Sequence, residues 1–424
     1  MEGYIPRILD TELDELLTGL PAISIEGPRA VGKTETATRR AKTVRRLDDA
    51  RTTEIIRAEP ERLTLGKPPI LIDEWQRMPT SWDLVRRAVD RDRTPARFLL
   101  TGSAAPTAAP THSGAGRIVT VRMRPMSLAE RGISEPTVNI SGLLSGQRPR
   151  LEGASQVRLG DYAAEIVNSG FPALRGNPER LCRAELDGYI HRIIDHDFDD
   201  LGLRIRDRDS LRRWMTAYAA ATSTSASFAT IRDAATPGEP DKPARSTTIS
   251  YRAALEQLWM IEEIPAWLPT RNRLRRLAAS PVHQLADPAL AARLLGVGAE
   301  ALLEGADSGR SIPRDGTLLG ALFESLLTLS VRVYAQANEA RVAHLRTRGG
   351  EREIDLILER ADGRVVALEV KLSATVDDED VRHLRWLADR LGPDLLDAAV
   401  ITTGSEAYRR NDGIGVIPAA LLTA

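Results

Sequence analysis

The chain contains 424 residues, of which 42% are hydrophobic, and its formal net charge is −1. This length predicts about two to four domains, and the hydrophobic share is large enough to fill their cores. The near-zero charge gives no global basic excess of the kind that argues for nucleic-acid binding. The single cysteine, Cys182, excludes intrachain disulfides and cysteine-cluster metal sites.

Two features of the sequence bear on its location in the cell. The first residues, Met1-Glu2-Gly3-Tyr4, do not resemble a signal peptide. We find no apolar run that is long enough to span a membrane. The sequence therefore predicts a cytoplasmic enzyme without a membrane partner.

The first motif is a glycine-rich loop between a predicted strand, 22–25, and a predicted helix, 35–41. Residues 27–34, Gly-Pro-Arg-Ala-Val-Gly-Lys-Thr, fit the phosphate-loop pattern G-x-x-x-x-G-K-[ST]. The backbone N–H groups of such a loop and the amino end of the following helix face a phosphate.

Each position of this loop has an expected role. Gly27 and Gly32 let the backbone curl around ATP, and Lys33 is expected to reach its β- and γ-phosphates. The Thr34 hydroxyl is expected to bind Mg²⁺. Arg29 either contacts phosphate from within the loop or pairs with a neighbouring acid.

Two further predicted strands end in polar residues. The apolar run 70–72 leads into Asp73 and Glu74, which would lie at the edge of a parallel sheet where ligands bind. Asp73 is expected to hold Mg²⁺, and Glu74 to polarise the water that attacks the γ-phosphate. The run 97–103 places Thr101 and Ser103 at the same edge, where they either sense the γ-phosphate or form a turn.

Strands predicted at 43–49 and 118–122 complete an alternation of strands and helices, which indicates an α/β parallel sheet. One strand separates the loop strand from the acidic strand, and a Glu follows the magnesium-binding Asp. Both features resemble the additional-strand catalytic-Glu class of P-loop ATPases, which includes the AAA+ proteins. Arg117 either stabilises charge on the γ-phosphoryl group or is a solvated strand end.

The middle of the chain carries weaker patterns. Residues 246–261 predict a helix-turn-helix piece with Thr247 and Thr248 as helix caps. Basic segments at 204–213 and 271–276 either contact phosphates or form salt-bridged helix faces. Turn-rich stretches predict a flexible loop at 107–116 and linkers at 234–243 and 308–316.

Near the carboxyl terminus, residues 349–358 predict a turn into a strand, and a hairpin turn at 362–363 leads to a second strand. Asp355 lies on the first strand. Glu369 and Lys371 lie two apart on the second strand, and therefore on one face. The pattern is an Asp followed, after thirteen residues, by Glu-x-Lys. It resembles the PD-(D/E)XK nuclease signature.

The surrounding elements support this resemblance. A helix at 318–327 carries Glu324, which matches an extra carboxylate of that family. The order helix, three strands, helix and strand is the core order that the family uses. Asp355 and Glu369 can bind Mg²⁺, which activates water, and Lys371 would position that water or stabilise the charge that forms. The alternative is an ordinary salt bridge on a solvated sheet face.

Taken as a whole, the chain resembles a prokaryotic family of AAA-like ATPases with a C-terminal domain of unknown function, DUF4143. The resemblance implies a P-loop ATPase domain at 1–135, a helical and winged-helix-like region at 136–310, and a nuclease-like α/β domain at 311–424. The residues that carry it are 4–7, 27–34, 71–75, 100–103, 116–117, 125–128 with Glu130, 170–172, 189–197 and 349–371.

The functional hypothesis is an ATP-binding and ATP-hydrolysing protein whose nucleotide state controls a nuclease-like domain that acts on DNA. The alternative is an ATP-driven switch whose C-terminal domain binds DNA or a protein partner without cleavage. A chaperone-like unfoldase is a third reading, for which we identify no pore-loop motif.

Overall fold

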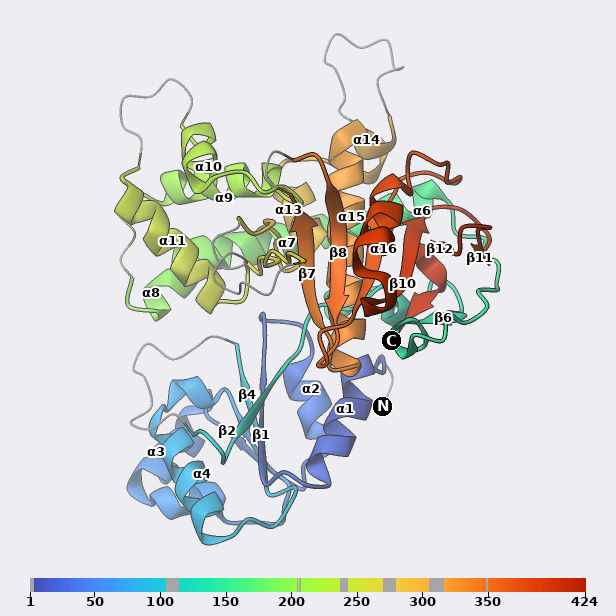
Figure 1. Cartoon of the computed structure of the whole chain (residues 1–424). Coiled ribbons are helices and arrows are strands. Elements are labelled where there is room, and N and C mark those ends of the chain that lie inside the picture. Colours follow the sequence, from blue (N-terminus) through green and yellow to red (C-terminus); the bar gives the residue numbers. More distant parts are fainter. Residues whose placement is uncertain are drawn as a thin grey trace.

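The computed structural model describes residues 4–103, 114–203, 205, 207–236, 243–269, 280–304, 316–347 and 350–424. In Figure 1 an amino-terminal α/β body lies below, and a helical region and a C-terminal α/β body lie side by side above it. Several predictions fall at least partly outside the described residues: the loop at 107–116, the linkers at 234–243 and 308–316, the basic segment at 271–276, Arg204, Arg206 and Gly349.

The amino-terminal body is built on a five-stranded sheet in the order β2-β3-β4-β1-β5. Every neighbouring pair runs parallel, and β4 lies between β1 and β3, as the sequence predicts. The central strands are buried on both faces, which explains their continuous apolar runs. The strands are β1 (Ala22–Glu26), β2 (Thr43–Arg46), β3 (Ile70–Asp73), β4 (Phe98–Gly102) and β5 (Val119–Arg122).

Helices cover both faces of this sheet. Alternate strand residues point to opposite faces, so Leu71 and Leu99 pack in one core and Ile70 and Phe98 in the other. The first core also contains buried residues of α1 and α2, and the second contains residues of α3 and α4. The helices are α1 (Ile8–Leu17), α2 (Lys33–Thr38), α3 (Ala50–Ala58) and α4 (Thr80–Arg91).

The helical region follows. Its α11 begins at Arg245 after Ala244, so Thr247 and Thr248 lie inside the helix, and their predicted capping role is wrong. After α11, two antiparallel bridges, Ile261↔Leu285 and Ile264↔Val282, join extended segments. The helices are α6 (Leu159–Asn168), α7 (Glu179–Arg192), α8 (Phe198–Asp200), α9 (Arg208–Ala220), α10 (Phe228–Ala234), α11 (Arg245–Gln257), α13 (Pro288–Leu294) and α14 (Ala299–Leu303).

The C-terminal body contains a six-stranded sheet in the order β11-β12-β10-β9-β8-β7. The chain runs α15, β7, β8, β9, α16, β10, which is the predicted order of helix, three strands, helix and strand. β7, β8 and β9 are antiparallel neighbours, whereas β9 and β10 run parallel. The elements are α15 (Gly316–Ala337), β7 (Arg341–Arg346), β8 (Glu353–Glu359), β9 (Val365–Val370), α16 (Arg382–Leu391), β10 (Leu395–Thr402), β11 (Tyr408–Arg409) and β12 (Gly415–Pro418).

Residues 138–155 also pack on this body. β6 (Val138–Asn139) pairs in parallel with β13 (Leu422–Thr423), and Ala154 forms a bridge with Glu406. α5 (Ile140–Ser145) lies against β9 and β10. The first residues of the predicted helical and winged-helix-like region, 136–310, therefore pack on the C-terminal body, because β6 pairs with a strand at the end of the chain.

α15 is the longest described helix and forms part of the main core. By length and composition alone, its stretch Leu318–Ala337 could cross a membrane, so the expectation that the sequence lacks such a run was too strict. However, 72% of that stretch is buried inside the protein, as in a core helix, and it is weak evidence for a membrane span.

Candidate functional site

The phosphate loop follows β1 and has the backbone that only glycine allows at two points. Gly27 has φ 153°, and a Cβ there would lie 2.0 Å from the Met123 carbonyl oxygen, which β5 delivers beside the loop. Gly32 has φ 99° in the left-handed region and directly precedes α2. The loop therefore depends on both glycines that the motif contains.

Lys33 begins α2 and is 6% exposed. Its Nζ donates hydrogen bonds to the carbonyl oxygens of Gly27, at 2.9 Å, and Pro28, at 2.6 Å. Burial lowers its pKa to about 8, while Glu74 acts in the opposite direction. The ammonium group is thus removed from water and held at the mouth of the loop.

Asp73, at the carboxyl end of β3, accepts hydrogen bonds from two hydroxyl groups. Thr34 Oγ1 donates to Asp73 Oδ1 at 2.8 Å, and Thr101 Oγ1 donates to the same oxygen at 2.5 Å. Thr34 and Asp73 are the two residues predicted to hold Mg²⁺, and oxygen donors of this kind suit that ion. Thr101 therefore contacts a candidate metal ligand, the Asp73 carboxylate.

Glu74 is held by two polar neighbours. Gln76 Nε2 donates to Glu74 Oε2 in a short hydrogen bond, and Ser103 Oγ donates to the same oxygen at 3.3 Å. Gln76 Nε2 also lies 3.2 Å from Ser103 Oγ. Our sequence reasoning missed Gln76, although its position two residues after Glu74, in the turn that leaves β3, was a usable signal.

The structure places the two candidate arginines differently. Arg29 lies in the loop, but its guanidinium pairs with Asp197 at 2.7 Å and Asp200 at 3.5 Å, which is the acid-paired alternative. Arg117 precedes the amino end of β5, whereas the loop follows the carboxyl end of its parallel neighbour β1. Arg117 pairs with Asp90 at 2.8 Å, so the structure does not bring it to the loop, and we correct that assignment.

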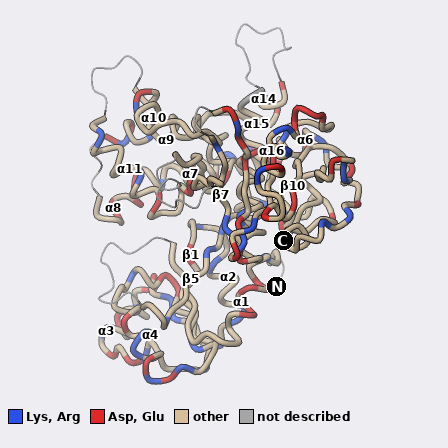
Figure 2. The backbone as a smooth tube through the Cα atoms, in the orientation of Figure 1, with Lys and Arg blue, Asp and Glu red and all other residues tan. Residues whose placement is uncertain are grey.

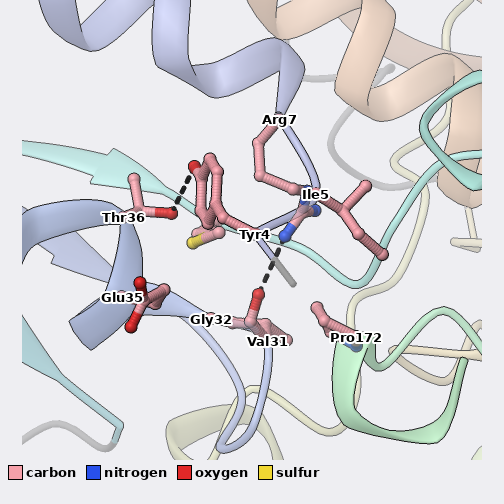
Figure 3. Close-up of a pocket in the computed structure, with 9 residues that line it drawn as sticks. Tyr4, Ile5, Arg7, Val31, Gly32, Glu35, Thr36 and Pro172 are labelled. Carbon is pink, nitrogen blue, oxygen red and sulfur yellow. Dashed lines mark hydrogen bonds between the residues drawn. The ribbon is translucent and has the colours of Figure 1, made fainter. Parts of the chain in front are cut away.

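A cavity of about 330 Å³ opens beside the phosphate loop. Figure 3 shows Tyr4 and Arg7 of the amino-terminal segment on one side and Gly32 and Thr36 on the other, with Pro172 of the helical region close by. The Tyr4 hydroxyl lies 3.1 Å from Thr36 Oγ1, and Arg7 Nη1 donates to the Val31 carbonyl at 2.8 Å. The amino-terminal segment is thereby fixed against the loop.

The second candidate site lies on β8 and β9. Asp355 Oδ2 accepts a hydrogen bond from the Val370 backbone N–H at 2.7 Å, and Lys371 Nζ donates to Glu369 Oε1 at 2.9 Å. The other oxygen of Glu369, Oε2, is buried without a hydrogen-bond partner. Asp355, Glu369 and Lys371 therefore come together as predicted.

Burial and neighbouring carboxylates raise the pKa values of the acids at this second site. Burial, followed by repulsion from Asp355, raises the pKa of Glu369 to about 8, and burial raises that of Asp355 to about 6. Burial and then Asp355 also raise the pKa of Glu324 on α15, which places this helix carboxylate near the pair. Such a cluster of acids favours a cation or shared protons.

The carboxylate geometry limits the protein ligands that a metal could have. Among the described residues, no group of three or more His, Cys, Asp and Glu side chains is arranged to hold a metal ion. Two carboxylates are nevertheless sufficient for Mg²⁺, which keeps several waters and takes substrate oxygens.

Two described arginines of the basic segment 204–213 form ion pairs. Arg208 pairs with Asp195 and Asp199, and Arg213 with Asp207. Figure 2 shows both charge signs interspersed along the described tube. For these residues the structure favours the salt-bridged alternative over phosphate contact.

Comparison with known families gives an assignment for both ends of the chain. Residues 20–131 match an AAA domain, 159–301 a domain of unknown function (DUF8612) and 319–422 a domain of unknown function (DUF4143). The chain thus combines an AAA domain with a C-terminal DUF4143 domain, which supports its resemblance to AAA-like P-loop ATPases with that domain. The matched stretches lie within the three predicted domains, whose outer limits stay predictions.

Two mycobacterial proteins are similar over most of this chain. Uncharacterized protein Rv2008c of Mycobacterium tuberculosis and uncharacterized protein Mb2031c of Mycobacterium bovis are each 25% identical over 407 residues, which is 94% of this chain and 80% of theirs. Among solved structures, a Walker-type ATPase of Pyrococcus abyssi aligns with a TM-score of 0.38 at 14% identity, over 67% of this chain and 94% of that chain.

Proposed function

We propose that the amino-terminal body binds and hydrolyses Mg²⁺-ATP. The observation that carries this proposal is the convergence of Lys33, Thr34, Asp73 and Glu74 at one sheet edge. A bound Mg²⁺ would supply positive charge that offsets the charge developing on the phosphate oxygens. Thr34 and Asp73 would hold it, and Lys33 would bind the phosphates in place of the loop carbonyls.

Glu74 is the base in this proposal. It accepts hydrogen bonds from Gln76 and Ser103, which leave its carboxylate fixed near Lys33. From there it would accept a proton from the water that attacks the γ-phosphate. Thr101 then orients Asp73 through its hydrogen bond, and Ser103 orients Glu74.

The cavity beside the loop supplies space for the rest of the nucleotide. Its volume of about 330 Å³ lies within the range of small-molecule sites. Tyr4, Ile5 and Met123 give it apolar and aromatic walls next to Gly32. We place the base and ribose of ATP there.

Nucleotide binding and hydrolysis are tested with purified full-length protein. We expect the wild type to bind ATP with Mg²⁺ and release phosphate, Lys33→Ala to lose binding, and Glu74→Gln to bind ATP without turnover. Binding by calorimetry and phosphate release are measured on the same samples. Undiminished turnover in Glu74→Gln would remove Glu74 from the mechanism.

We further propose that the C-terminal site cleaves phosphodiester bonds of DNA with Mg²⁺ or Mn²⁺. The observation that carries this is the buried, unpartnered Oε2 of Glu369 beside Asp355 and Lys371. Two hard carboxylates with raised pKa values fit a divalent cation, which would supply an activated water when bound. Lys371 would orient the attacked phosphate, and Glu324 would extend the acidic wall.

α15 offers a path by which nucleotide state could control this site. Glu324 and Gln336 lie twelve residues apart on α15, which corresponds to about 18 Å along a helix. Gln336 Oε1 accepts a hydrogen bond from Arg124, just after β5, at 2.6 Å. One helix thus contacts the amino-terminal body near its carboxyl end and contributes Glu324, nearer its middle, to the acidic site.

Cleavage is tested with single- and double-stranded DNA, with Mg²⁺ or Mn²⁺, and with or without ATP. We expect metal-dependent cleavage that ATP alters and that Asp355→Ala abolishes, while Asp355→Ala still hydrolyses ATP. Hydrolysis of ATP without cleavage of either DNA would instead support a switch that binds DNA or a protein partner without cutting.

A further inference from the structure

Two motifs of the helical region, 170–172 and 189–197, have no part in the functions proposed above. Both lie against the phosphate loop. Pro172 lines the cavity beside Gly32, and Phe171 packs on Tyr189 with ring centroids 5.0 Å apart. The Tyr189 hydroxyl lies 3.4 Å from the Arg29 carbonyl oxygen, to which it donates. The helical region therefore forms a second wall of the nucleotide site.

The strongest contact across this boundary joins Arg29 to Asp197. Arg29 Nη1 donates to Asp197 Oδ1 at 2.7 Å, and Asp197 is only 2% exposed. Asp197 ends a π-helical turn, Ile193–Asp197, between α7 and α8. Such wide turns often occur at functional positions, because the extra residue changes the direction in which a side chain points.

Arg192, the other arginine that pairs with Asp197, could not replace Arg29 as its main partner. Arg192 approaches the same oxygen only at 3.8 Å, and its side chain is 56% exposed. Burial raises the pKa of Asp197, and Arg29 is the largest influence that opposes this rise. Removing one member of a buried ion pair leaves an uncompensated charge, so the two side chains hold each other in place.

Arg29 is also close enough to act on the phosphate site. After burial and Glu74, Arg29 has the next largest effect on the pKa of Lys33, which it lowers. A second fixed cation next to Lys33 would strengthen binding of a polyphosphate. Its position is set by a carboxylate that lies 168 residues away in the sequence.

We infer that Asp197 is a positioning residue of the nucleotide site, which holds the Arg29 guanidinium for ATP and links nucleotide affinity to docking of the helical region. The inference rests on the proposed binding of ATP. Because coupling is reciprocal, bound ATP stabilises the contact between the phosphate loop and residues 189–200. Binding of ATP would thereby affect the docking of α7 and α8 directly, and this effect would not require Glu74 or the C-terminal site.

The test compares full-length wild type, Asp197→Asn, Arg29→Gln and their double variant. We expect each single substitution to raise the ATP dissociation constant and the KM about tenfold, with kcat little changed. The double variant should be no weaker than the weaker single variant, since both remove one contact. Asp199→Asn is the matched control, because Asp199 is an exposed neighbour that pairs with Arg208 and not with Arg29.

Hydrogen exchange supplies a readout that a purely structural role would not change. In the wild type, ATP should slow exchange at residues 189–200, and in Asp197→Asn it should not. Thermal unfolding without nucleotide checks that each variant is folded. If Asp197→Asn does not fold, the same comparison is made with Arg29→Gln.

The outcomes separate the two proposals. A wild type that binds ATP, together with an Asp197→Asn variant of equal affinity, would overturn the inference and leave the proposed function intact. Additive losses in the double variant would also overturn it. A wild type that binds no ATP would overturn both.

Discussion

At the scale of single residues, both candidate sites hold charged groups away from water. Lys33 in the phosphate loop has a lowered pKa, and Glu369 on β9 has a raised one. In each case burial makes the charged form costly, and a ligand of opposite charge would restore it. The two sites are therefore complementary to polyphosphate and to a divalent cation, respectively.

Lys33 gives a prediction about pH. Its pKa of about 8 lies below the ordinary lysine value of 10.5, so the free protein loses this positive charge as the pH rises through 8. Bound polyphosphate favours the ammonium form. We expect ATP affinity to fall about fivefold from pH 8 to pH 9, with uptake of a proton on binding.

Calorimetry in two buffers of different ionisation enthalpy measures this proton uptake. Lys33→Arg is the control, because arginine stays charged over this range. Its affinity should be lower but should not change with pH in this way. An affinity of the wild type that is constant from pH 7 to pH 9 would contradict the prediction.

Glu369 gives a prediction about stability. Its folded-state pKa of about 8 exceeds the ordinary glutamate value of 4.5, so its stabilising contribution is complete below pH 4.5 and is lost as the pH rises through 8. Without metal ions, the unfolding temperature should therefore fall between pH 5 and pH 8. Glu369→Gln should reduce this fall, because the amide does not ionise.

Addition of Mn²⁺ at pH 8 should raise the unfolding temperature of the wild type and leave Glu369→Gln nearly unchanged. Thermal scans in chelator and in metal make the comparison without a nuclease assay. Equal responses of the two proteins to Mn²⁺ would show that Glu369 is not a ligand.

The sequence predicted the residues whose partners are local or lie at one sheet edge. Lys33 and Thr34 follow from the loop motif, and Asp73 from the end of a buried strand. Arg29 and Arg117 were uncertain because their partners, Asp197 and Asp90, depend on tertiary packing that residue spacing does not encode.

At the scale of elements, three arginines from two bodies surround one glutamate of the segment after α11. Arg124 Nη2 lies 2.6 Å from Glu262 Oε1, Arg122 Nη2 lies 3.3 Å from Glu262 Oε2, and Arg332 Nη1 of α15 lies 3.6 Å from that oxygen. Burial alone would raise the pKa of Glu262, but the arginines outweigh it and hold the pKa well below its usual range. β5, the helical region and α15 thus meet at one carboxylate.

Glu262→Gln should lower the free energy of unfolding by about 2 kcal/mol, because it leaves charged donors without a charged acceptor. The stability that Glu262 contributes is present above its ordinary pKa and is lost in acid, so the difference between wild type and variant should shrink as the pH falls well below 4.5. Urea unfolding at neutral and acid pH measures both effects. Glu256→Gln, at an exposed pair with Arg252, should change stability by less than about 0.5 kcal/mol.

Element types were predictable where the hydrophobic pattern was strong. The runs that became β1, β3 and β4 are mostly apolar because helices cover both faces of the sheet. The predicted start of α11 was wrong. Ala244 precedes the helix without a side-chain cap, and the two threonines that were expected to cap it lie inside the helix. Pairing of β6 with β13 joins residues 138 and 422, and no local pattern reveals such a contact.

At the scale of the whole molecule, the ATPase body contacts the rest of the chain in at least two places. The Arg29–Asp197 pair joins the phosphate loop to α7 and α8, and Arg124 joins the end of β5 to Glu262 and Gln336. The first contact lies at the nucleotide, and the second leads along α15 toward Glu324. Nucleotide affinity and control of the C-terminal site should therefore be separable by substitution.

Arg124→Ala makes that separation testable. We expect the variant to hydrolyse ATP and to cleave DNA with metal, since Arg124 belongs to neither reacting group. ATP should no longer alter the cleavage rate, which corresponds to a loss of about 1 kcal/mol or more of coupling. The measured quantity is the ratio of cleavage rates with and without ATP. Arg117→Ala, at an exposed pair with Asp90 on the opposite sheet edge, should keep the wild-type ratio, and an unchanged ratio in Arg124→Ala would exclude α15 as the path.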